Sequence, residues 1–155
     1  MRRPRIAMLA TLVLASVLGG ARAQDLAADQ PRAAFDHFIS AFNALDWETF
    51  RRCFADSASL FNPDIPDVIS LDRLDGRKDI ERSFRAVFDS AVKANTHGPN
   101  IHPESVRVQQ FNDTAIITFA FRRPQHSVGR RTIVLNKQGG SWLIVHIHAS
   151  NITPK

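Results

Sequence analysis

The segment that decides the fold lies just before the C-terminus and reads Trp142-Leu143-Ile144-Val145-His146-Ile147-His148-Ala149-Ser150-Asn151. A β-strand points successive side chains to opposite faces of its sheet. With this period, one face carries Trp142, Ile144, His146, His148 and Ser150, and the other carries Leu143, Val145, Ile147 and Ala149. Both faces begin with apolar residues, so we expect a strand that is covered on both sides.

The residues upstream of this segment predict a sheet of mostly antiparallel strands. Apolar residues that alternate with polar ones indicate strands at 106–111, 114–122 and 130–137. Gly139-Gly140 is a hairpin-turn signal that joins the last of these to a strand at 142–152. A short strand is predicted earlier, at 57–62, and an irregular hairpin or loop follows it at 63–74.

Three helices are predicted before the long strands. Pro31 suits the first turn of a helix, and apolar residues follow it at helical spacing. Asp46 can cap a second helix, and Gly76 with Asp79 introduces a third. Helices first and a β-meander after them predict an α+β fold, with the helices packed on one face of a strongly bent sheet.

The first 23 residues have the pattern of a secretory signal peptide. A basic start at residues 2–5 is followed by an apolar run of thirteen residues at 6–18 and by the cleavage signal Ala21-Arg22-Ala23. The run is too short to span a membrane as a helix, which takes about 20 residues. We therefore expect an exported chain, periplasmic or secreted, that begins at Gln24 and has no membrane anchor.

The charge of the chain gives no support to nucleic-acid binding. The formal net charge is +5, but four of the 20 basic residues lie in the predicted signal peptide. The remaining 16 basic residues stand against 15 acidic ones, a net charge of +1. Such a balance provides no basic surplus to attract a polyanion.

Length and cysteine content fit one small domain. After a flexible tail at 24–30, residues 31–155 are enough for a single hydrophobic core. Cys53 is the only cysteine, which excludes an intramolecular disulfide. It lies beside Phe50 and Phe54 on a predicted helical face, which indicates a buried thiol rather than a nucleophile.

Four segments occur in an order that resembles a known family. They are the helical stretch at 38–47, the stretch from Phe54 to Pro63, Gly76-Arg77-Lys78-Asp79-Ile80, and the closing Trp142-x-x-x-His146-x-His148-x-Ser150. In this order they resemble the nuclear-transport-factor-2-like superfamily, specifically its SnoaL-like branch. The closing His-x-His-x-Ser also resembles the association domain of calcium/calmodulin-dependent kinase II.

The resemblance implies a cone-shaped fold, in which a bent sheet wraps a long helix and leaves a cavity open at one end. It also implies a homodimer formed through the outer face of the sheet. The superfamily includes isomerases, cyclases, dehydratases, hydrolases, ligand binders and association modules. The fold alone therefore does not decide the function.

The two histidines of the last strand are the first site candidates. Placed at the floor of the cavity, His146 and His148 could hold a ligand together with Ser150, or one of them could act as a general base. Alternatively, they form a polar cluster with Ser150 and a neighbouring strand, without a ligand. A zinc site is a third interpretation, because two imidazoles on one strand supply two ligands. We expect no metal, because the sequence does not identify further ligands.

The arginine pair is the second site candidate. Arg130 and Arg131 point to opposite faces of a strand, so at most one lines a given cavity. In the kinase association domain that this chain resembles, a basic pocket binds small carboxylates, and one of its arginines lies on the penultimate strand. Arg130 or Arg131 would be its counterpart, while Phe121 and Ala149 occupy the places of the other two. A charge at the sheet edge is the alternative interpretation.

Two positions argue against one activity of the superfamily. In the ketosteroid isomerases, an aspartate precedes the proline after the first strand, and a tyrosine on the first helix donates to the substrate. Here Asn62 and Phe38 occupy those positions, and neither can perform that proton chemistry. Both remain candidates for the cavity wall. Trp47 is a third candidate there, with the core as its alternative place.

These observations leave three functional hypotheses. We expect an apolar cavity built from Phe35, Phe38, Phe42, Phe61, Phe84 and Phe88. The first hypothesis is the binding of a small apolar or carboxylated molecule without turnover. The second is a small-molecule enzyme of the isomerase, cyclase, dehydratase or hydrolase type that uses a histidine base. The third is a non-catalytic dimerisation module. None of them calls for a cofactor.

Overall fold

The computed structural model describes residues 30–61, 73–124 and 126–152. The predicted signal peptide, the predicted tail up to residue 29 and the site candidate Asn62 lie outside the described residues. The strand-like run at 68–71 also lies outside them. No helix in the described ranges is long and apolar enough to cross a membrane.

In the described residues, six strands form one sheet in the order β2-β1-β6-β5-β4-β3. The strands are β1 (Phe54–Phe61), β2 (Leu74–Asp75), β3 (Glu104–Phe111), β4 (Thr114–Arg122), β5 (Val128–Gln138) and β6 (Ser141–Ile152). β6 lies in the middle of the sheet, parallel to β1 and antiparallel to β5. The remaining neighbours are antiparallel, so the mostly antiparallel sheet is confirmed.

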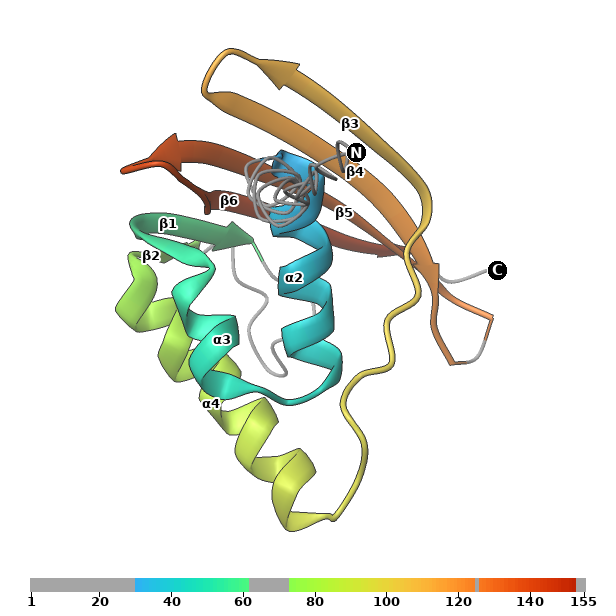
Figure 1. The fold of residues 1–155 in the computed structure, drawn as a ribbon. Helices are drawn as coiled ribbons and strands as arrows, with labels where there is room; N and C mark the ends of the chain where they lie inside the picture. The colour runs from blue at the N-terminus through green and yellow to red at the C-terminus, as the bar shows by residue number, and fades with distance from the viewer. Residues whose placement is uncertain (1–29, 62–72, 125, 153–155) are drawn as a thin grey trace, which may run out of the picture.

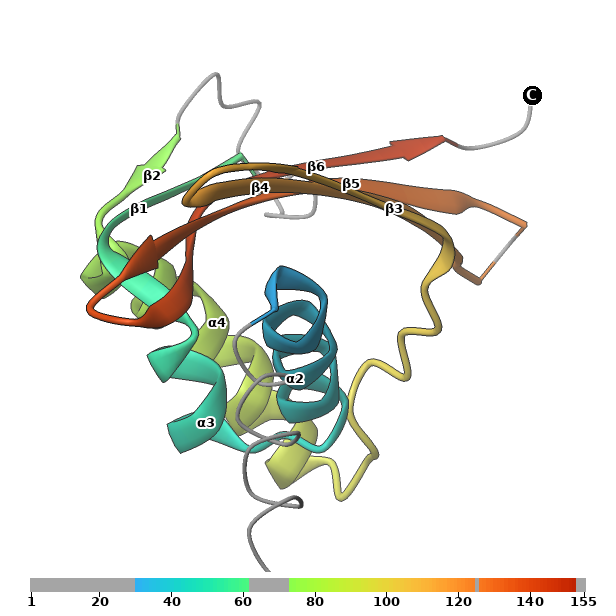
Figure 2. The same cartoon turned by 45° about the horizontal axis from the view of Figure 1, so that its top comes forward.

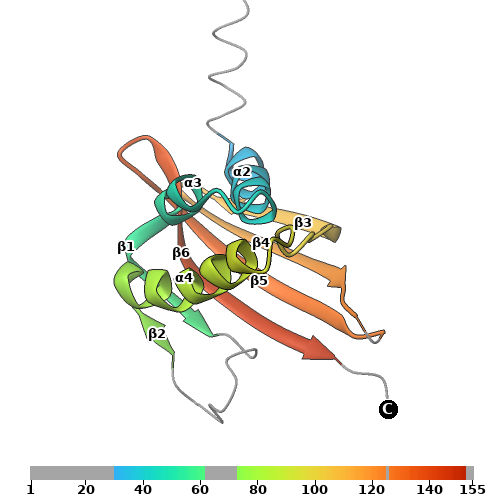
Figure 3. The same cartoon turned by 90° about the horizontal axis from the view of Figure 1, so that it is seen from below.

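The described helices all lie on one face of this sheet (Figure 1). They are α2 (Pro31–Asn43), α3 (Trp47–Arg52) and α4 (Arg77–Lys93). Figure 2 shows the sheet curving over them, and in Figure 3 the same helices lie in front of the strands. The predicted α+β architecture, with about three helices on one face of a bent sheet, is confirmed.

Local signals in the sequence set the helix boundaries. Pro31 occupies the first turn of α2, where the missing N–H would have no intrahelical partner. The Asp46 carboxylate caps α3 by accepting a hydrogen bond from the Thr49 backbone N–H at 3.1 Å. Hydrogen bonds from the Thr49 side chain and then from its backbone N–H lower the pKa of Asp46. α4 begins after Gly76, whose φ of 86° favours glycine.

A cluster of aromatic rings holds the helices to the sheet. Phe50 of α3 is 1% exposed, and the surrounding rings have their centroids 5.0 to 6.2 Å from its own. These rings belong to Phe38, Phe42, Trp47, Phe54, Phe84 and Phe88. Full burial of such a ring contributes about 1.5–3 kcal/mol. The cluster therefore joins α2, α3, α4 and β1 into one core.

A bulge in β6 overturns the predicted assignment of its faces. Val134 of β5 pairs with His146, whereas the next residue, Leu135, pairs with Ile144. Val145 is thus an extra residue that has no partner on β5. One extra residue moves every later side chain to the opposite face.

The outcome is a strand whose polar groups face away from the helices. The helical face of β6 carries the buried residues Trp142, Ile144, Ile147 and Ala149. His146, His148 and Ser150 face the outer side. The predicted grouping of Trp142 with the two histidines is therefore wrong, because a strict period of two does not survive the bulge. The prediction that β6 is covered on both faces is also wrong, since no described element lies over the outer face of the sheet (Figure 2).

The turns agree with the sequence better than the strand faces do. Gly139 and Gly140 have φ values of 56° and 86° and form the predicted hairpin turn between β5 and β6. β2 differs from the prediction. The sequence indicated an irregular hairpin or loop there, but the two residues of β2 pair with Ser59 and Leu60 of β1. So short a strand has no alternation by which a sequence could reveal it.

Asn43 connects the end of α2 to the segment before β3. Its side-chain N–H donates to the Ile101 carbonyl at 2.8 Å, and its side-chain oxygen accepts from the Ile101 N–H at 2.7 Å. One amide thus satisfies both backbone groups of a residue that belongs to no helix or strand. The pair holds the 94–103 connection against the helices.

We predict that Asn43→Ala lowers the free energy of unfolding by about 1–3 kcal/mol, because two partly buried backbone groups lose their partner. Urea unfolding followed by circular dichroism measures the change. Gln138→Ala removes a single 3.3 Å bond at the surface and serves as the control. An equal effect of the two substitutions would contradict the proposed role of Asn43.

Candidate functional site

A cavity of about 360 Å³ lies between the helices and the inner face of the sheet. Its walls are mostly apolar, with aromatic rings from Phe38, Phe42, Phe84, Phe119 and Phe121. Ile133, Ile147 and Ala149 complete the wall on the sheet side. Among the described lining residues, the ionisable ones are Arg122, Arg123 and Arg131. The cavity therefore has an apolar body and a cationic end.

Arg131 is the arginine that faces this cavity, whereas Arg130 points to the outer face. The Arg131 guanidinium carbon lies 4.9 Å from the centre of the Phe121 ring, a cation–π contact. Its Nη1 donates to the backbone carbonyls of Arg130 and Ser150, each at 2.9 Å. These contacts hold the cation at one place on the wall.

Asn151 connects two of the cavity arginines. Its side-chain oxygen accepts a hydrogen bond from Arg123 at 2.9 Å and another from Arg131 at 3.3 Å. The sequence interpretation missed both Asn151 and Arg123. Alternation places Asn151 on the cavity face, with Ile147, only when the bulge at Val145 is taken into account, and the sequence carries no signal for that bulge.

Gly129 makes room for the ring on which Arg131 lies. A Cβ at this position would come within 2.5 Å of Cε1 and Cζ of Phe121. Gly129 and Phe121 are partners in the β5–β4 ladder, so the ring folds across the glycine. The absence of a side chain at Gly129 thus positions Phe121 and, through it, Arg131.

We predict that Gly129→Ala lowers the free energy of unfolding by about 1–3 kcal/mol, because the Phe121 ring must move in a packed core. Thermal and urea unfolding measure this loss. Gly139→Asn is the matched control, since nothing lies within 4 Å of a Cβ there and asparagine tolerates its φ of +56°. Unchanged stability of Gly129→Ala would show that the ring is not held as described.

His146 and His148 do not lie at the floor of the cavity. They occupy the outer face, where His146 Nδ1 lies 2.9 Å from the Ser59 hydroxyl of β1. The Phe61 ring lies against both imidazoles, with centroid distances of 6.0 and 5.8 Å. Partial burial, followed by the charges of His148 and Arg73, lowers the pKa of His146. The contact between His146 and Ser59 of the neighbouring strand is one that the polar-cluster interpretation predicts.

Ser150 and Arg130 line a shallow depression of the outer face. Thr118, Thr132 and His148 are also part of its lining. The depression and the cavity lie on opposite faces of the same three strands. Ser150 and Arg130 are therefore separated from the cavity by the sheet, although their backbone carbonyls accept hydrogen bonds from Arg131.

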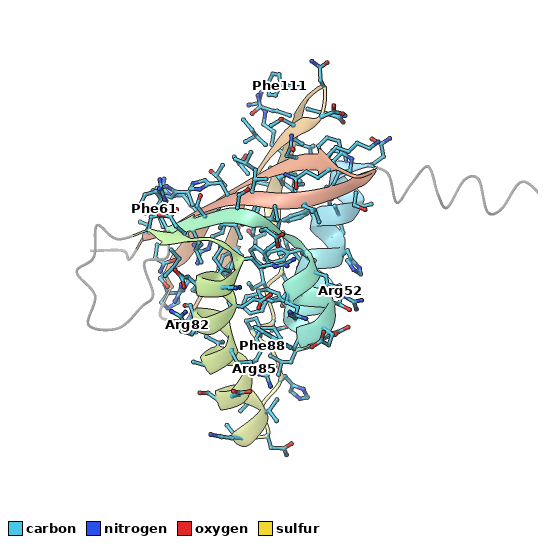
Figure 4. The ribbon with its side chains drawn as sticks, turned by 90° about the vertical axis from the view of Figure 1, so that its left-hand side faces the viewer. Arg52, Phe61, Arg82, Arg85, Phe88 and Phe111 are labelled. Carbon is cyan, nitrogen blue, oxygen red and sulfur yellow. The ribbon has the colours of Figure 1, made fainter. Side chains whose placement is uncertain are left out.

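The remaining candidates are divided between cavity, core and outer face. Phe38 lines the cavity, as predicted. Trp47 is not among the described lining residues; it packs on Phe50 and Phe88, and the Arg85 guanidinium lies 5.0 Å from its ring centre. Of the phenylalanines predicted to form the cavity, Phe35 and Phe88 lie in the core and Phe61 lies on the outer face. Figure 4 shows Phe88 between the helices and Phe61 on the far side of the sheet.

Cys53 is a partly buried thiol that packs against the core, whereas the sequence predicted a buried one. Its sulfur donates to the Thr49 carbonyl at 3.4 Å. Burial raises the pKa of the thiol to about 11. A thiol that stays protonated at neutral pH is a poor nucleophile.

We predict a loss of stability at high pH that depends on Cys53. Its pKa is higher in the folded than in the unfolded chain, so its contribution is complete below about pH 8.5 and is lost as the pH rises toward 11. Unfolding curves between these pH values measure the loss, and Cys53→Ala should lack this part of it. The chain has no tyrosine whose titration would overlap. Identical pH profiles of the two proteins would contradict the prediction.

The described residues contain no cluster of three or more histidine, cysteine or carboxylate side chains that could bind a metal ion. The described wall of the cavity also offers no imidazole, carboxylate or thiol. What this site can do chemically is to surround an apolar group and attract an anionic one.

Comparisons with known proteins agree with this geometry. The model of the SnoaL-like domain family matches residues 32–154. This match covers most of the chain, so the chain belongs to the SnoaL-like domain family. No match among curated proteins was found.

Three solved structures show the extent of the likeness. A candidate dehydratase of the NTF2-like family from Streptomyces avermitilis is 22% identical, with a TM-score of 0.65 over 84% of this chain and 99% of that one. A ketosteroid isomerase-like protein from Erwinia carotovora atroseptica is 22% identical, with a TM-score of 0.60 over 84% and 98%. The association domain of CaMKII from C. elegans is 20% identical, with a TM-score of 0.55 over 84% and 95%. At these identities the likeness shows the fold alone.

Proposed function

We propose that this member of the SnoaL-like family binds a small molecule with an apolar body and a carboxylate head in its cavity. The observation that carries the proposal is the composition of the described wall, where rings and aliphatic side chains surround the space and arginine is the only ionisable type. Apolar walls bind the apolar part of a ligand through non-directional hydrophobic contacts. A guanidinium binds a carboxylate by charge-assisted hydrogen bonds.

The position of Arg131 supports an anionic head group rather than a neutral one. The guanidinium lies on the Phe121 ring and donates to backbone carbonyls, so little side-chain freedom is left to lose on binding. A carboxylate at this end would lie near Arg123 as well, since Asn151 contacts both arginines. The neighbouring positive charges would add to its attraction.

The same wall favours binding over acid–base catalysis. A general base must lie within hydrogen-bond reach of the proton it removes. His146 and His148, our predicted bases, lie across the sheet from the cavity, and an arginine does not lose its proton at neutral pH. An enzymatic role for the two histidines would therefore need a substrate on the outer face. Binding of a ligand in the cavity does not need the histidines.

Export and self-association are parts of the same proposal. The signal-peptide pattern at 1–23 supports a periplasmic or secreted protein. The outer face of the sheet supports a homodimer, because no described helix covers it and its middle carries Ile116, Val134 and Thr132. Some of the solved structures that resemble this chain are association domains.

Octanoate and octanol are suitable probes, because they differ in the head group and share the apolar body. We predict that the chain binds octanoate more tightly than octanol in isothermal titration calorimetry. Arg131→Gln should weaken the binding of octanoate about tenfold, by loss of a charge-assisted hydrogen bond worth about 1.4 kcal/mol, and leave octanol unchanged.

Arg130→Gln is the matched control, since it removes the same group from the opposite face of the same strand. It should leave the affinity for both probes unchanged. A loss of octanoate binding in Arg130→Gln, or equal losses of octanoate and octanol in Arg131→Gln, would overturn the assignment of Arg131 as the carboxylate partner.

A further inference from the structure

We propose that His146 and His148 form half of a zinc site that is completed by the same two residues of a second copy of this chain. The site would lie on the outer face of the sheet, where two copies meet. It is separate from the cavity, and it would make the association of two copies depend on the metal.

The bulge at Val145 is the first observation that supports this site. It brings both imidazoles to the outer face, two positions apart on one straight part of β6 and so about 7 Å apart at their Cα atoms. Phe61 of β1 lies against both rings. The two side chains thus share one small area of the face, as a pair of metal ligands must.

The contact between Ser59 and His146 is the second observation. The hydroxyl lies 2.9 Å from Nδ1, so an Nδ1–H that donates to it leaves the lone pair of Nε2 for a metal. Histidines that bind metals usually donate their other ring N–H to a fixed oxygen, which sets the tautomer and the orientation of the ring. Ser59 can perform this role from the neighbouring strand.

The number of ligands leads to the second copy. Zinc takes four ligands in structural sites, and imidazole nitrogen is one of its common ligands. Within the described part of one chain, no third histidine, cysteine or carboxylate joins the pair. A twofold axis through the outer face would bring a second His-x-His pair to the same point, because both copies use the same surface in such an interface. Four imidazoles then complete a tetrahedral site.

The surroundings of the pair suit a contact between two copies. In the sheet ladder, Ile116 and Val134 lie in line with His146, while Thr118 and Thr132 lie in line with His148. These side chains are uncharged, and all four are partly buried within one copy. A core without charges and a polar rim are what a protein interface requires.

The charged residues of this face lie around the pair rather than in it. Arg107 lies at the β3 end of the row that contains His148, and Arg130 lies on the next row, beside Ser150. Arg73, whose positive charge acts on His146, is bonded to the Asp75 carboxylate at 2.7 and 3.1 Å. That carboxylate reduces the repulsion between Arg73 and a bound dication.

The test measures mass and zinc content together. The purified chain is treated with EDTA, dialysed, and examined by sedimentation equilibrium and native mass spectrometry before and after zinc sulfate is added. The result expected is a monomer that becomes a dimer on addition of zinc, with one zinc ion in each dimer. His146→Ala and His148→Ala should abolish both the zinc and the dimer.

Two further variants separate the site from general histidine binding. Ser59→Ala should weaken zinc binding by about tenfold or more, because the ring of His146 loses its orienting partner. His102→Ala is the matched control, since this exposed histidine bonds only to Asn100 in the described contacts and lies outside the sheet. It should leave zinc binding and mass unchanged. Circular dichroism confirms that each variant is folded.

The inference rests on the proposed homodimer and not on the cavity ligand, and the outcomes distinguish the two. A dimer of equal strength with and without zinc, or in His148→Ala, would overturn the metal site and leave the dimer standing. One zinc ion per monomer, without a change in mass, would also overturn it. A monomer under every condition would overturn both the metal site and the dimer, while octanoate binding would be unaffected.

Discussion

The extra residue in β6 is the constraint on which both faces of the sheet depend. Without Val145, the strand would keep one alternation from end to end, and the two imidazoles would face the helices. With it, Trp142 and Ile144 enter the core beside the aromatic cluster, and Ile147 and Ala149 continue the same wall further along. A bulge also increases the local twist of the strands, which suits a sheet that bends over helices. One residue therefore sets the apolar lining of the cavity and the polar pattern of the outer face together.

The sheet thus separates two kinds of chemistry. On the inner side, Arg131 lies on Phe121 because Gly129 leaves room for the ring, so a backbone position without a side chain determines where a positive charge lies. On the outer side, hydroxyls and imidazoles lie in the same rows as β-branched residues. A ligand in the cavity and a partner on the outer face would be only one sheet apart, and β5 and β6 contribute to both.

Local features of this fold could be predicted, and features that depend on register could not. The helix at Pro31, the cap at Asp46 and the turn at Gly139-Gly140 each follow from a few adjacent residues, and all three are present. The bulge could not be foreseen, because every residue from Trp142 to Val145 is apolar, so both faces look alike there, and neither glycine nor proline marks the place. Because the bulge was missed, His146 and His148 were assigned to the wrong face of the sheet. The choice between Arg130 and Arg131 stayed open for the same reason, since a shift of one residue exchanges their faces.

The central place of β6 has a consequence for the way the chain acquires its structure. β1 is the partner of β6, and Phe54 pairs with Ile144, so two segments far apart in the sequence must meet before the sheet is continuous. Until then, β1 and β2 form one piece and β3, β4 and β5 another, with no ladder between them. Contacts of such long range slow folding, because a large loop must close first. β6, the last of the described strands, joins the two pieces, and until it does the apolar inner face of each piece lacks part of its cover.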